Sequence, residues 1–351
     1  MTGTVEADIH PRVEVVCLGE SMVTFLPSRP GRLADVPSFA RTIGGAESNV
    51  ACALAAAGHA VKWISRVGAD GFGDHLVDAV AAYGVDTSGV RRDPGRPTGI
   101  YFRTATDRAT DAHEVAYYRA GSAASAMSPE NMPSADLWSG RVLHLSGITA
   151  ALSDDCLALM RELTARRPGR PLVSFDVNHR PGLWRDASGA RVLLDLARGA
   201  DLVFVGEDEA AQAWDLRGAD AIREALPEPG TLVVKRGGAG ATLYTREAAH
   251  GRRDTVTAVP ALRVEVVAPV GAGDAFAAGF LSATLRGLPA AARLRHGHLM
   301  AAAALTAPGD LGTPPSRAHA DRLAGLSAAG WERLRLGPGW TAATEQEVRT
   351  P

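Results

Sequence analysis

The stretch PVGAGDAF, Pro269–Phe276, places two glycines and an aspartate at the start of a segment with helical spacing. Backbone N–H groups at the start of a helix bind anions, and glycine lets the backbone come close to a phosphate. Asp274 would repel the same anion. Either the stretch is an ordinary helix start, with Asp274 interacting favourably with the helix dipole, or the carboxylate has a separate function.

Short apolar runs alternate with helical segments over most of the chain. VEVVCLG precedes the Ala-rich ESNVACALAAAG, PLVSFDVN precedes SGARVLLDLARG, and ADLVFVG precedes EDEAAQAW. This alternation is typical of an α/β fold with a doubly wound, mostly parallel sheet flanked by helices. Residues 24–42 and 97–121 show hairpin-like alternation instead, so we expect one small β-lid over the crevice at the carboxyl ends of the strands.

Composition restricts the partners and the compartment. The 351 residues are 46% hydrophobic and 22% charged, with a formal net charge of −2, so there is no global attraction to nucleic acid or to anionic membranes. Cys17, Cys52 and Cys156 are odd in number and far apart, which favours reduced packing thiols. The N-terminus lacks the pattern of a signal peptide. We therefore expect a cytoplasmic protein with small-molecule partners.

Several familiar site patterns are absent or incomplete. No GxxxxGK[ST] motif occurs, so ATP would not be held by a Walker-type loop. Gly68, Gly71 and Gly73 follow a predicted strand, but Leu76 occupies the third glycine of a GxGxxG fingerprint, which disfavours a dinucleotide site. His296 and His298 lie two apart on a predicted helix and would point to different faces, so packing is a better interpretation than metal binding.

A second glycine-containing stretch narrows the interpretation of PVGAGDAF. GGAESNVA, residues 44–51, is followed by six residues, Gly58, nine residues and Gly68. The two stretches together resemble the paired signatures of the ribokinase-like (PfkB) carbohydrate kinases. The resemblance covers residues 13–313, which implies one kinase domain and leaves residues 314–351 as a C-terminal extension, expected to hold a short helix and a mobile tail. TGIYFR, YYRAGSAAS and DVNHRPGLW are most similar to members that phosphorylate 2-keto-3-deoxygluconate.

The resemblance implies separate functions for the two parts of PVGAGDAF. Asp274 matches the family's catalytic base, and Gly271, Ala272 and Gly273 match its anion hole, whose N–H groups face the transferred phosphoryl group. Phosphoryl transfer to an alcohol needs both a base beside the attacking hydroxyl and donors at the oxygens where charge gathers. The repulsion between Asp274 and a phosphate is then avoided, because the carboxylate faces the acceptor.

The acceptor in this subgroup is a sugar acid, and binding its carboxylate requires a cation, best supplied by a planar guanidinium. Arg119 alone would be interpreted as a solvated surface arginine, but Arg119 and Arg180 together match the family's substrate arginines. Gly45, Tyr101 and Tyr117 match other residues that line the same site.

The resemblance also implies a nucleotide site. The turn KRGGAG would run along ATP, although an exposed β-turn is the simpler alternative. Glu209 matches a glutamate that assists Mg²⁺ through water, and a helix N-terminal acid is its alternative. The implied nucleotide-binding residues are Asn178, Arg180, Gly206, Lys235, Gly237, Gly238, Gly240, Gly271, Gly273 and His298.

Three positions depart from the pattern. Ala268 replaces an aspartate that is associated with a monovalent-cation site in many relatives, so potassium activation is in doubt. Gly206 stands where Asn or Ser is common, and His298 where close relatives can carry Asn near the adenine.

The resemblance thus predicts transfer of the γ-phosphoryl group of Mg·ATP to the C6 hydroxyl of 2-keto-3-deoxygluconate or a close relative. Two alternatives stay open: a kinase of a neutral sugar such as ribose or fructose, and a non-catalytic sugar or nucleotide sensor. The edge of the lid is a plausible surface for a homo-oligomer.

Overall fold

An eight-stranded sheet forms the centre of this computed structural model, which describes the chain apart from residues 1–12, 105–113, 185, 187, 247–252 and 343–351. Its strand order is β14-β13-β12-β11-β10-β9-β1-β4. Neighbours from β12 to β4 pair in parallel, and β13 runs antiparallel to β12 and β14, which confirms the predicted sheet. The strands are β1 (Val15–Leu18), β4 (Val61–Ile64), β9 (Val142–Ser146), β10 (Leu172–Asp176), β11 (Leu202–Gly206), β12 (Thr231–Lys235), β13 (Ala241–Arg246) and β14 (Asp254–Val259).

Both faces of this sheet are buried under helices, which explains why its central strands are almost continuously apolar. In β11, Leu202 and Phe204 belong to one core cluster, whereas Val203 and Val205 belong to the other. Side chains of a strand alternate between faces, so one short apolar run supplies both cores.

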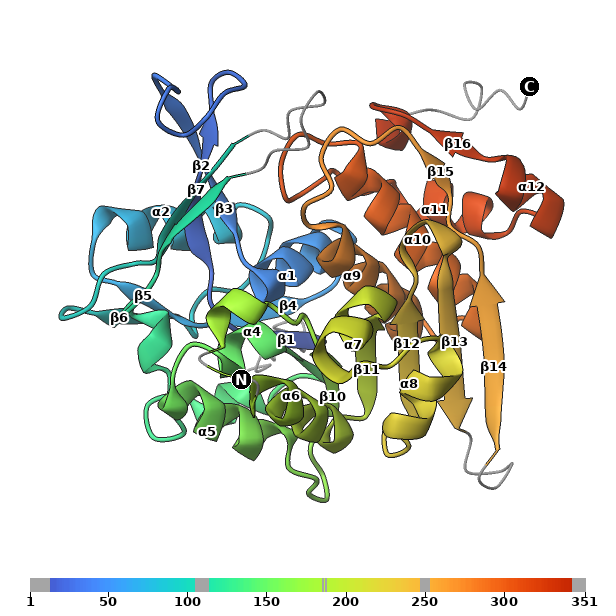
Figure 1. Cartoon of the computed structure of the whole chain (residues 1–351), viewed down its shortest axis with the longest axis horizontal. Helices are drawn as coiled ribbons and strands as arrows, with labels where there is room; N and C mark the ends of the chain where they lie inside the picture. Colours follow the sequence, from blue (N-terminus) through green and yellow to red (C-terminus); the bar gives the residue numbers. More distant parts are fainter. Residues whose placement is uncertain (1–12, 105–113, 185, 187, 247–252, 343–351) are drawn as a thin grey trace, which may run out of the picture.

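Helices cover the sheet on both sides (Figure 1). Residues of α1, α2, α9, α10, α11 and α12 join the first core cluster, and residues of α3 to α8 join the second. Asp70 and Ser153 begin α2 and α5 by accepting backbone N–H groups of the first turn. Among the helices of the described residues, none has the length and apolarity needed to cross a membrane. The helices are α1 (Ala46–Ala56), α2 (Gly71–Ala81), α3 (Ser134–Leu137), α4 (Gly147–Ala150), α5 (Asp154–Thr164), α6 (Ser188–Gly199), α7 (Glu207–Trp214), α8 (Ala219–Ala225), α9 (Ala272–Leu285), α10 (Ala290–Leu305), α11 (Arg317–Ala324) and α12 (Ala328–Arg333).

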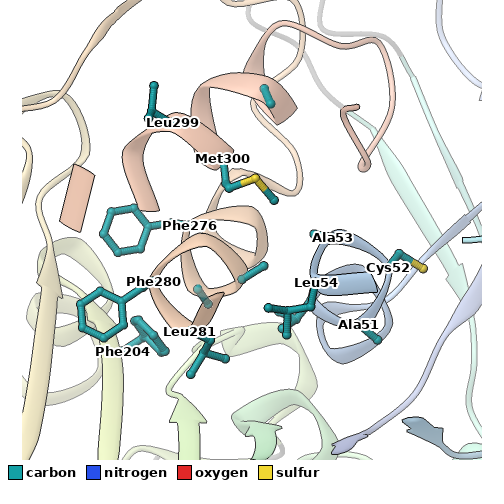
Figure 2. Close-up of a cluster of buried hydrophobic side chains, with 14 of the residues drawn as sticks. Ala51, Cys52, Ala53, Leu54, Phe204, Phe276, Phe280, Leu281, Leu299 and Met300 are labelled. Carbon is teal, nitrogen blue, oxygen red and sulfur yellow. The ribbon is translucent and has the colours of Figure 1, made fainter. Parts of the chain in front are cut away.

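Helix α9 is buried over Phe276–Ala283 and packs against both α1 and the sheet. Figure 2 shows Leu54 of α1 beside Leu281 of α9, and Phe280 of α9 beside Phe204 of β11. The rings of Phe204 and Phe280 meet edge to face with centroids 5.4 Å apart. Close packing of this kind fixes both helices against the sheet, so the signature residues at their N-termini are held in register.

The two segments with hairpin-like alternation form a separate four-stranded sheet, called the lid here, in the order β3-β2-β7-β8. Tyr101 pairs with Tyr117 across two of its strands, so both side chains lie on one face. Phe25 stacks on Phe102 on the opposite face, with ring centroids 4.6 Å apart. Figure 1 shows the lid standing apart from the main sheet. Its strands are β2 (Met22–Pro27), β3 (Phe39–Gly44), β7 (Ile100–Arg103) and β8 (Val115–Tyr118), and a smaller pair of strands is β5 (Arg66–Gly68) and β6 (Arg91–Asp93).

The chain after residue 313 packs onto the main body. Helices α11 and α12 lead to β16 (Arg335–Leu336), which pairs in parallel with β15 (Arg263–Val264). Trp331 is buried, and its Nε1 donates to the carbonyl of Pro260 across 2.9 Å. The predicted short helix is thus followed by further ordered structure, because Trp331 and Trp340 supply apolar area that the expectation of a mobile tail overlooked. The last part of that predicted tail, 343–351, lies outside the described residues.

Candidate active site

A cleft of about 620 Å³ lies at the carboxyl ends of the central strands. Glu20 follows β1, Asn178 follows β10, Glu209 follows β11, and Lys235 ends β12. Strand β1 has β4 on one side and β9 on the other, so the order of strands reverses there. Ligands of open α/β sheets bind at such a switch point. The predicted residues that line this one cleft are Gly45, Tyr101, Tyr117, Arg119, Asn178, Arg180, Glu209, Lys235, Gly271, Ala272, Gly273 and Asp274.

Helix α9 begins in the wall of the cleft with the predicted anion hole. Gly271 is its N-cap residue and has φ 77°, a left-handed conformation that favours glycine. A β-carbon at this position would also overlap the backbone oxygen of Asp310. The amide of Ala275 donates to the carbonyl of Gly271 across 2.9 Å, which closes the first turn. The amides before Ala275 have no carbonyl of an earlier helical turn to bind, so they are suited to an anion.

Asp274 lies in that first turn, and its carboxylate is held by helix α1. Asn49 Nδ2 donates to Asp274 Oδ2 across 2.8 Å. Burial raises the pKa of Asp274 to about 8; the Asn49 hydrogen bond opposes the rise and the neighbouring Asp176 adds to it. A carboxylate with this pKa is a much stronger base than an ordinary aspartate, as general-base catalysis near neutral pH requires.

Lys235 lies beside the first turn of α9. Its Nζ donates to Asp176 across 2.8 and 3.1 Å, and it is also the nearest described atom to a β-carbon placed on Gly273. Burial lowers the pKa of Lys235, but Asp176, Glu209 and Asp274 together raise it above its usual value. The ammonium group therefore stays charged beside the start of α9.

Arg119 projects from the end of the lid into the cleft, where it meets a buried carboxylate. It forms an ion pair with Glu20, and Ser122 Oγ donates to the other oxygen of Glu20 across 2.9 Å. The guanidinium carbon lies 5.7 Å from the centroid of the Tyr117 ring, within range of a cation–π contact. Ion pair and ring together fix the orientation of this guanidinium.

Asp310, in the loop after α10, connects to the lid. Its Oδ1 is 2.8 Å from Arg103 Nη2, and its Oδ2 accepts a hydrogen bond from the Tyr101 hydroxyl across 3.1 Å. Burial raises the pKa of Asp310, and Arg103 opposes that rise. The same residue therefore contacts the lid through its side chain and Gly271 through its backbone.

Arg180 is the most exposed cation of the cleft, with 56% of its side chain accessible, and its Nη1 lies 3.6 Å from Glu209 Oε1. Glu209 also accepts from the backbone N–H of Gly206 across 2.9 Å at the start of α7. Asn178, two residues before Arg180, has φ 40° and carries a side-chain oxygen without a hydrogen-bond partner among the described residues. Strained backbone and unpaired buried polar atoms both occur preferentially at functional sites.

Charges in the cleft are closely balanced. Five carboxylates and four cations line it, and each of the four cations has a carboxylate within 4.0 Å. Asp274 is the lining carboxylate outside these four pairs. An anion that enters the cleft can therefore pair with one of these cations only by replacing its carboxylate partner. Before an anion binds, the cleft has little net positive charge. The pairs are Arg103–Asp310, Arg119–Glu20, Arg180–Glu209 and Lys235–Asp176.

Five residues proposed for the nucleotide do not line this cleft. His298 lies in the core, its ring 5.2 Å from that of Phe276 and 6.3 Å from that of Trp331. Burial lowers its pKa to about 4, so it is neutral. The other four are Gly206, Gly237, Gly238 and Gly240.

Five lining residues with polar or charged side chains were not among the sequence candidates. Two of them follow signature phrases that were already recognised: Asn49 ends GGAESN, and Asp176 begins DVNHR. A search for polar residues at strand ends would have found Asp176 and Glu20. Arg103 and Asp310 carried no such signal, since their pairing spans more than two hundred residues. The five are Glu20, Asn49, Arg103, Asp176 and Asp310.

Comparison with known families agrees with this geometry. Residues 13–317 match the model for "pfkB family carbohydrate kinase". The chain belongs to the pfkB family. It is accordingly an ATP-dependent carbohydrate kinase, and the family resemblance noted in the sequence is confirmed.

Two similar relatives carry the same enzyme name. The chain is 34% identical to "2-dehydro-3-deoxygluconokinase" of Thermoproteus tenax over 79% of this chain and 83% of the relative. It is 33% identical to "2-dehydro-3-deoxygluconokinase" of Bacillus subtilis (strain 168) over 91% and 96%. A third relative, "Probable fructokinase-6, chloroplastic" of Arabidopsis thaliana, is 32% identical over 76% and 69%. Kinases of sugar acids and of neutral sugars therefore both occur among the pfkB relatives.

Solved structures agree on the fold. A PfkB protein from Polaromonas sp. JS666 superposes with a TM-score of 0.76 at 34% identity, covering 88% of this chain and 99% of that one. A sugar kinase from Pyrococcus horikoshii in complex with ATP gives 0.74 at 25% identity, covering 90% and 99%. The ribokinase-like α/β architecture with its lid is thus shared with pfkB kinases of known structure.

Proposed function

We propose that this pfkB kinase transfers the γ-phosphoryl group of ATP to the C6 hydroxyl of 2-keto-3-deoxygluconate or a close 2-keto-3-deoxy sugar acid. The observation that carries the proposal is that two guanidinium groups, Arg119 and Arg180, line the same cleft as Asp274. A guanidinium can bind a carboxylate through two parallel hydrogen bonds. The names of two relatives support the same substrate class.

In the proposed mechanism, Asp274 accepts the proton of the attacking hydroxyl as its oxygen approaches the γ-phosphorus. The raised pKa of Asp274 suits that task, and the hydrogen bond from Asn49 keeps the carboxylate oriented. The N–H groups of Gly271, Ala272 and Gly273 stabilise charge on the transferred group. Lys235 adds a positive charge close to Gly273. Tyr101, Tyr117 and Gly45 shape the acceptor side, where a β-carbon at Gly45 would overlap the backbone oxygen of Glu20.

ATP is proposed to bind along Asn178, Arg180 and Lys235, with its phosphates directed at α9. Within the described residues no group of three His, Cys, Asp or Glu side chains could hold a metal by itself. The donors present therefore fit Mg²⁺ that is held mainly by phosphates and water, with Glu209 contacting it through water. Mg²⁺ would supply charge neutralisation on the phosphates. At Ala268 the methyl group offers no ligand, so this position would contribute only its backbone carbonyl to a monovalent cation.

A neutral sugar acceptor is the second candidate. The ion pair between Glu20 and Arg119 favours it, because this arginine is already compensated before any substrate arrives. The fructokinase among the relatives points the same way.

A coupled ADP-release assay tests the proposal. Purified protein is offered 2-keto-3-deoxygluconate, its galactonate-derived epimer, ribose and fructose, each with Mg·ATP. We expect turnover with a sugar acid, and a raised acceptor KM after Arg119→Met or Arg180→Met. Turnover with a neutral sugar alone, or an acceptor KM insensitive to removal of the Arg119 and Arg180 charges, would refute the sugar-acid proposal.

We also propose that two copies associate through the lid. Strand β8 is an edge strand, and Tyr118 on it is 65% exposed. Exposed edge strands with aromatic side chains commonly pair with another chain. Sizing the protein in solution tests this, and Tyr118→Asp should shift a dimer towards the monomer.

A further inference from the structure

Two parts of the cleft that are far apart in sequence meet at Asp310. Its carboxylate contacts Arg103 and Tyr101 of lid strand β7, while its backbone oxygen lies against Gly271 at the start of α9. Asp310 is 5% exposed and Arg103 is 6% exposed. A buried carboxylate held by a guanidinium and a hydroxyl has few positions open to it, and its own backbone moves with it.

We propose that Arg103 is a positioning residue for phosphoryl transfer, acting through Asp310 on the turn Gly271–Gly273. This inference rests on the proposed role of that turn in holding the transferred phosphate. Arg103 fixes the Asp310 carboxylate, the Asp310 backbone oxygen packs against Gly271, and Gly271 sets the direction of the amides that follow it.

The Asp310 backbone lies so close to Gly271 that the position of Gly271 depends on the position of the Asp310 loop. There is no room for a β-carbon between Gly271 and Asp310, so a displacement of the loop is transmitted to the turn. Asn49, Ala275 and Leu311 line an adjoining cavity of about 10 Å³, and Asp310 and Gly271 line it too. A cavity of this size leaves little empty volume to absorb a shift of the loop.

The charge arrangement explains why the positioning depends on Arg103. Without this guanidinium, Asp310 would keep the Tyr101 hydroxyl as its partner but would lose its compensating charge. An uncompensated buried carboxylate is costly, so the loop would move or the group would take up a proton. Either change alters the contact at Gly271.

Amide hydrogen exchange of the ligand-free full-length protein tests the connection without any acceptor. The readout is the Ala275 amide, which donates to Gly271. We expect Arg103→Met to lose protection at Ala275, and Arg103→Lys, which can keep the ion pair, to retain it. Arg41→Met is the matched lid control, because it removes an exposed guanidinium of lid strand β3 that lies outside the contacts of Asp310. Unchanged protection at Ala275 in Arg103→Met would overturn the inference.

Kinetics supply the second test. Arg103→Met should lower kcat by up to about 10²-fold with the KM for ATP nearly unchanged, as expected for a small misplacement of catalytic groups. Arg103→Met/Asp310→Asn should lose no more than either single variant, because the two residues act as one unit. The double variant also removes both buried charges, so it leaves no uncompensated buried charge that could prevent folding. Additive losses in the double variant would contradict the inference. If the true acceptor proves to be a neutral sugar, the proposed substrate fails, while the exchange test needs no acceptor and the kinetic test is performed with that sugar.

Discussion

Asn49 Nδ2 donates a hydrogen bond to Asp274 Oδ2 across 2.8 Å, and this bond joins two residues that are 225 positions apart. It connects GGAESNVA at the start of α1 to PVGAGDAF at the start of α9. The two stretches that identified the family are therefore in direct contact, and the packing of α1 on α9 maintains that contact (Figure 2).

Asp274→Asn should remove most of the turnover while the protein stays folded. A positioned general base contributes about 10²–10⁴ in rate, so kcat should fall by that factor. Replacing a desolvated carboxylate by an amide removes an unfavourable charge, so thermal stability should not decrease. Steady-state ADP release and thermal unfolding check both points, and a variant that retains wild-type kcat would exclude Asp274 as the base.

The pH dependence of kcat/KM should show the ionisation of Asp274. Since the base must be deprotonated, kcat/KM should rise with pH and level off above about 8. Stability should change in the opposite sense: between pH 3.8 and about 8 the native protein retains a proton that the unfolded chain has lost, so unfolding becomes easier as pH rises. Asp274→Asn should lack this pH-dependent loss of stability. Melting temperatures of the two proteins, compared between pH 3.8 and about 8, measure the difference.

Asn49→Ala should move the rising limb of that profile to higher pH. The Asn49 hydrogen bond stabilises the ionised carboxylate and so lowers the pKa of Asp274; its loss lets burial raise the pKa further. Activity at pH 7 should fall more than activity at pH 9. An equal loss at both pH values would show that Asn49 affects something other than the ionisation of the base.

Arg119→Met should destabilise the protein more than Arg119→Met combined with Glu20→Gln. The single change leaves Glu20 as a buried charge without its guanidinium, at a cost of about 3–5 kcal/mol. The double change removes both charges and should recover most of that loss in a urea-unfolding experiment. Equal stabilities would mean that the ion pair contributes little to the fold.

Gly271→Ala and Gly287→Ala form a matched pair. Both glycines have positive φ, 77° and 69°, and a left-handed alanine costs about 1–2 kcal/mol. A β-carbon at Gly287 meets open space, whereas one at Gly271 overlaps the Asp310 backbone. Both variants should lose stability, but only Gly271→Ala should also lose kcat. Similar kinetics in the two variants would argue against a role for the turn in phosphoryl transfer.

The sequence contained enough to predict the sheet, the lid strands and most of the cleft. Parallel strands in an α/β sheet direct their carboxyl ends to one edge, so residues such as Asn178, Glu209 and Lys235 had to lie near one another. The two hairpins of the lid followed from alternation, because β2 pairs with β3 and β7 with β8 in antiparallel fashion, whereas the parallel pairing of β2 with β7 that joins them did not.

The pairing of charges could not be predicted in the same way. Glu20 meets Arg119, and Arg103 meets Asp310, only because the lid and the main sheet come together across the cleft. His298 shows the converse. Its position matched a family contact, but the helix turns its ring towards Trp331, which belongs to the C-terminal segment. Neither local spacing nor a single motif reports such tertiary contacts.

The paired cations have a kinetic consequence. At neutral pH a largely protonated Asp274 leaves four carboxylates opposite four cations in the cleft, so its formal charge is close to zero. Long-range attraction speeds association only where a site presents a net field. Reactants that carry negative charge would then arrive at rates that depend little on ionic strength, and discrimination among them would arise after entry, in how fast each one dissociates.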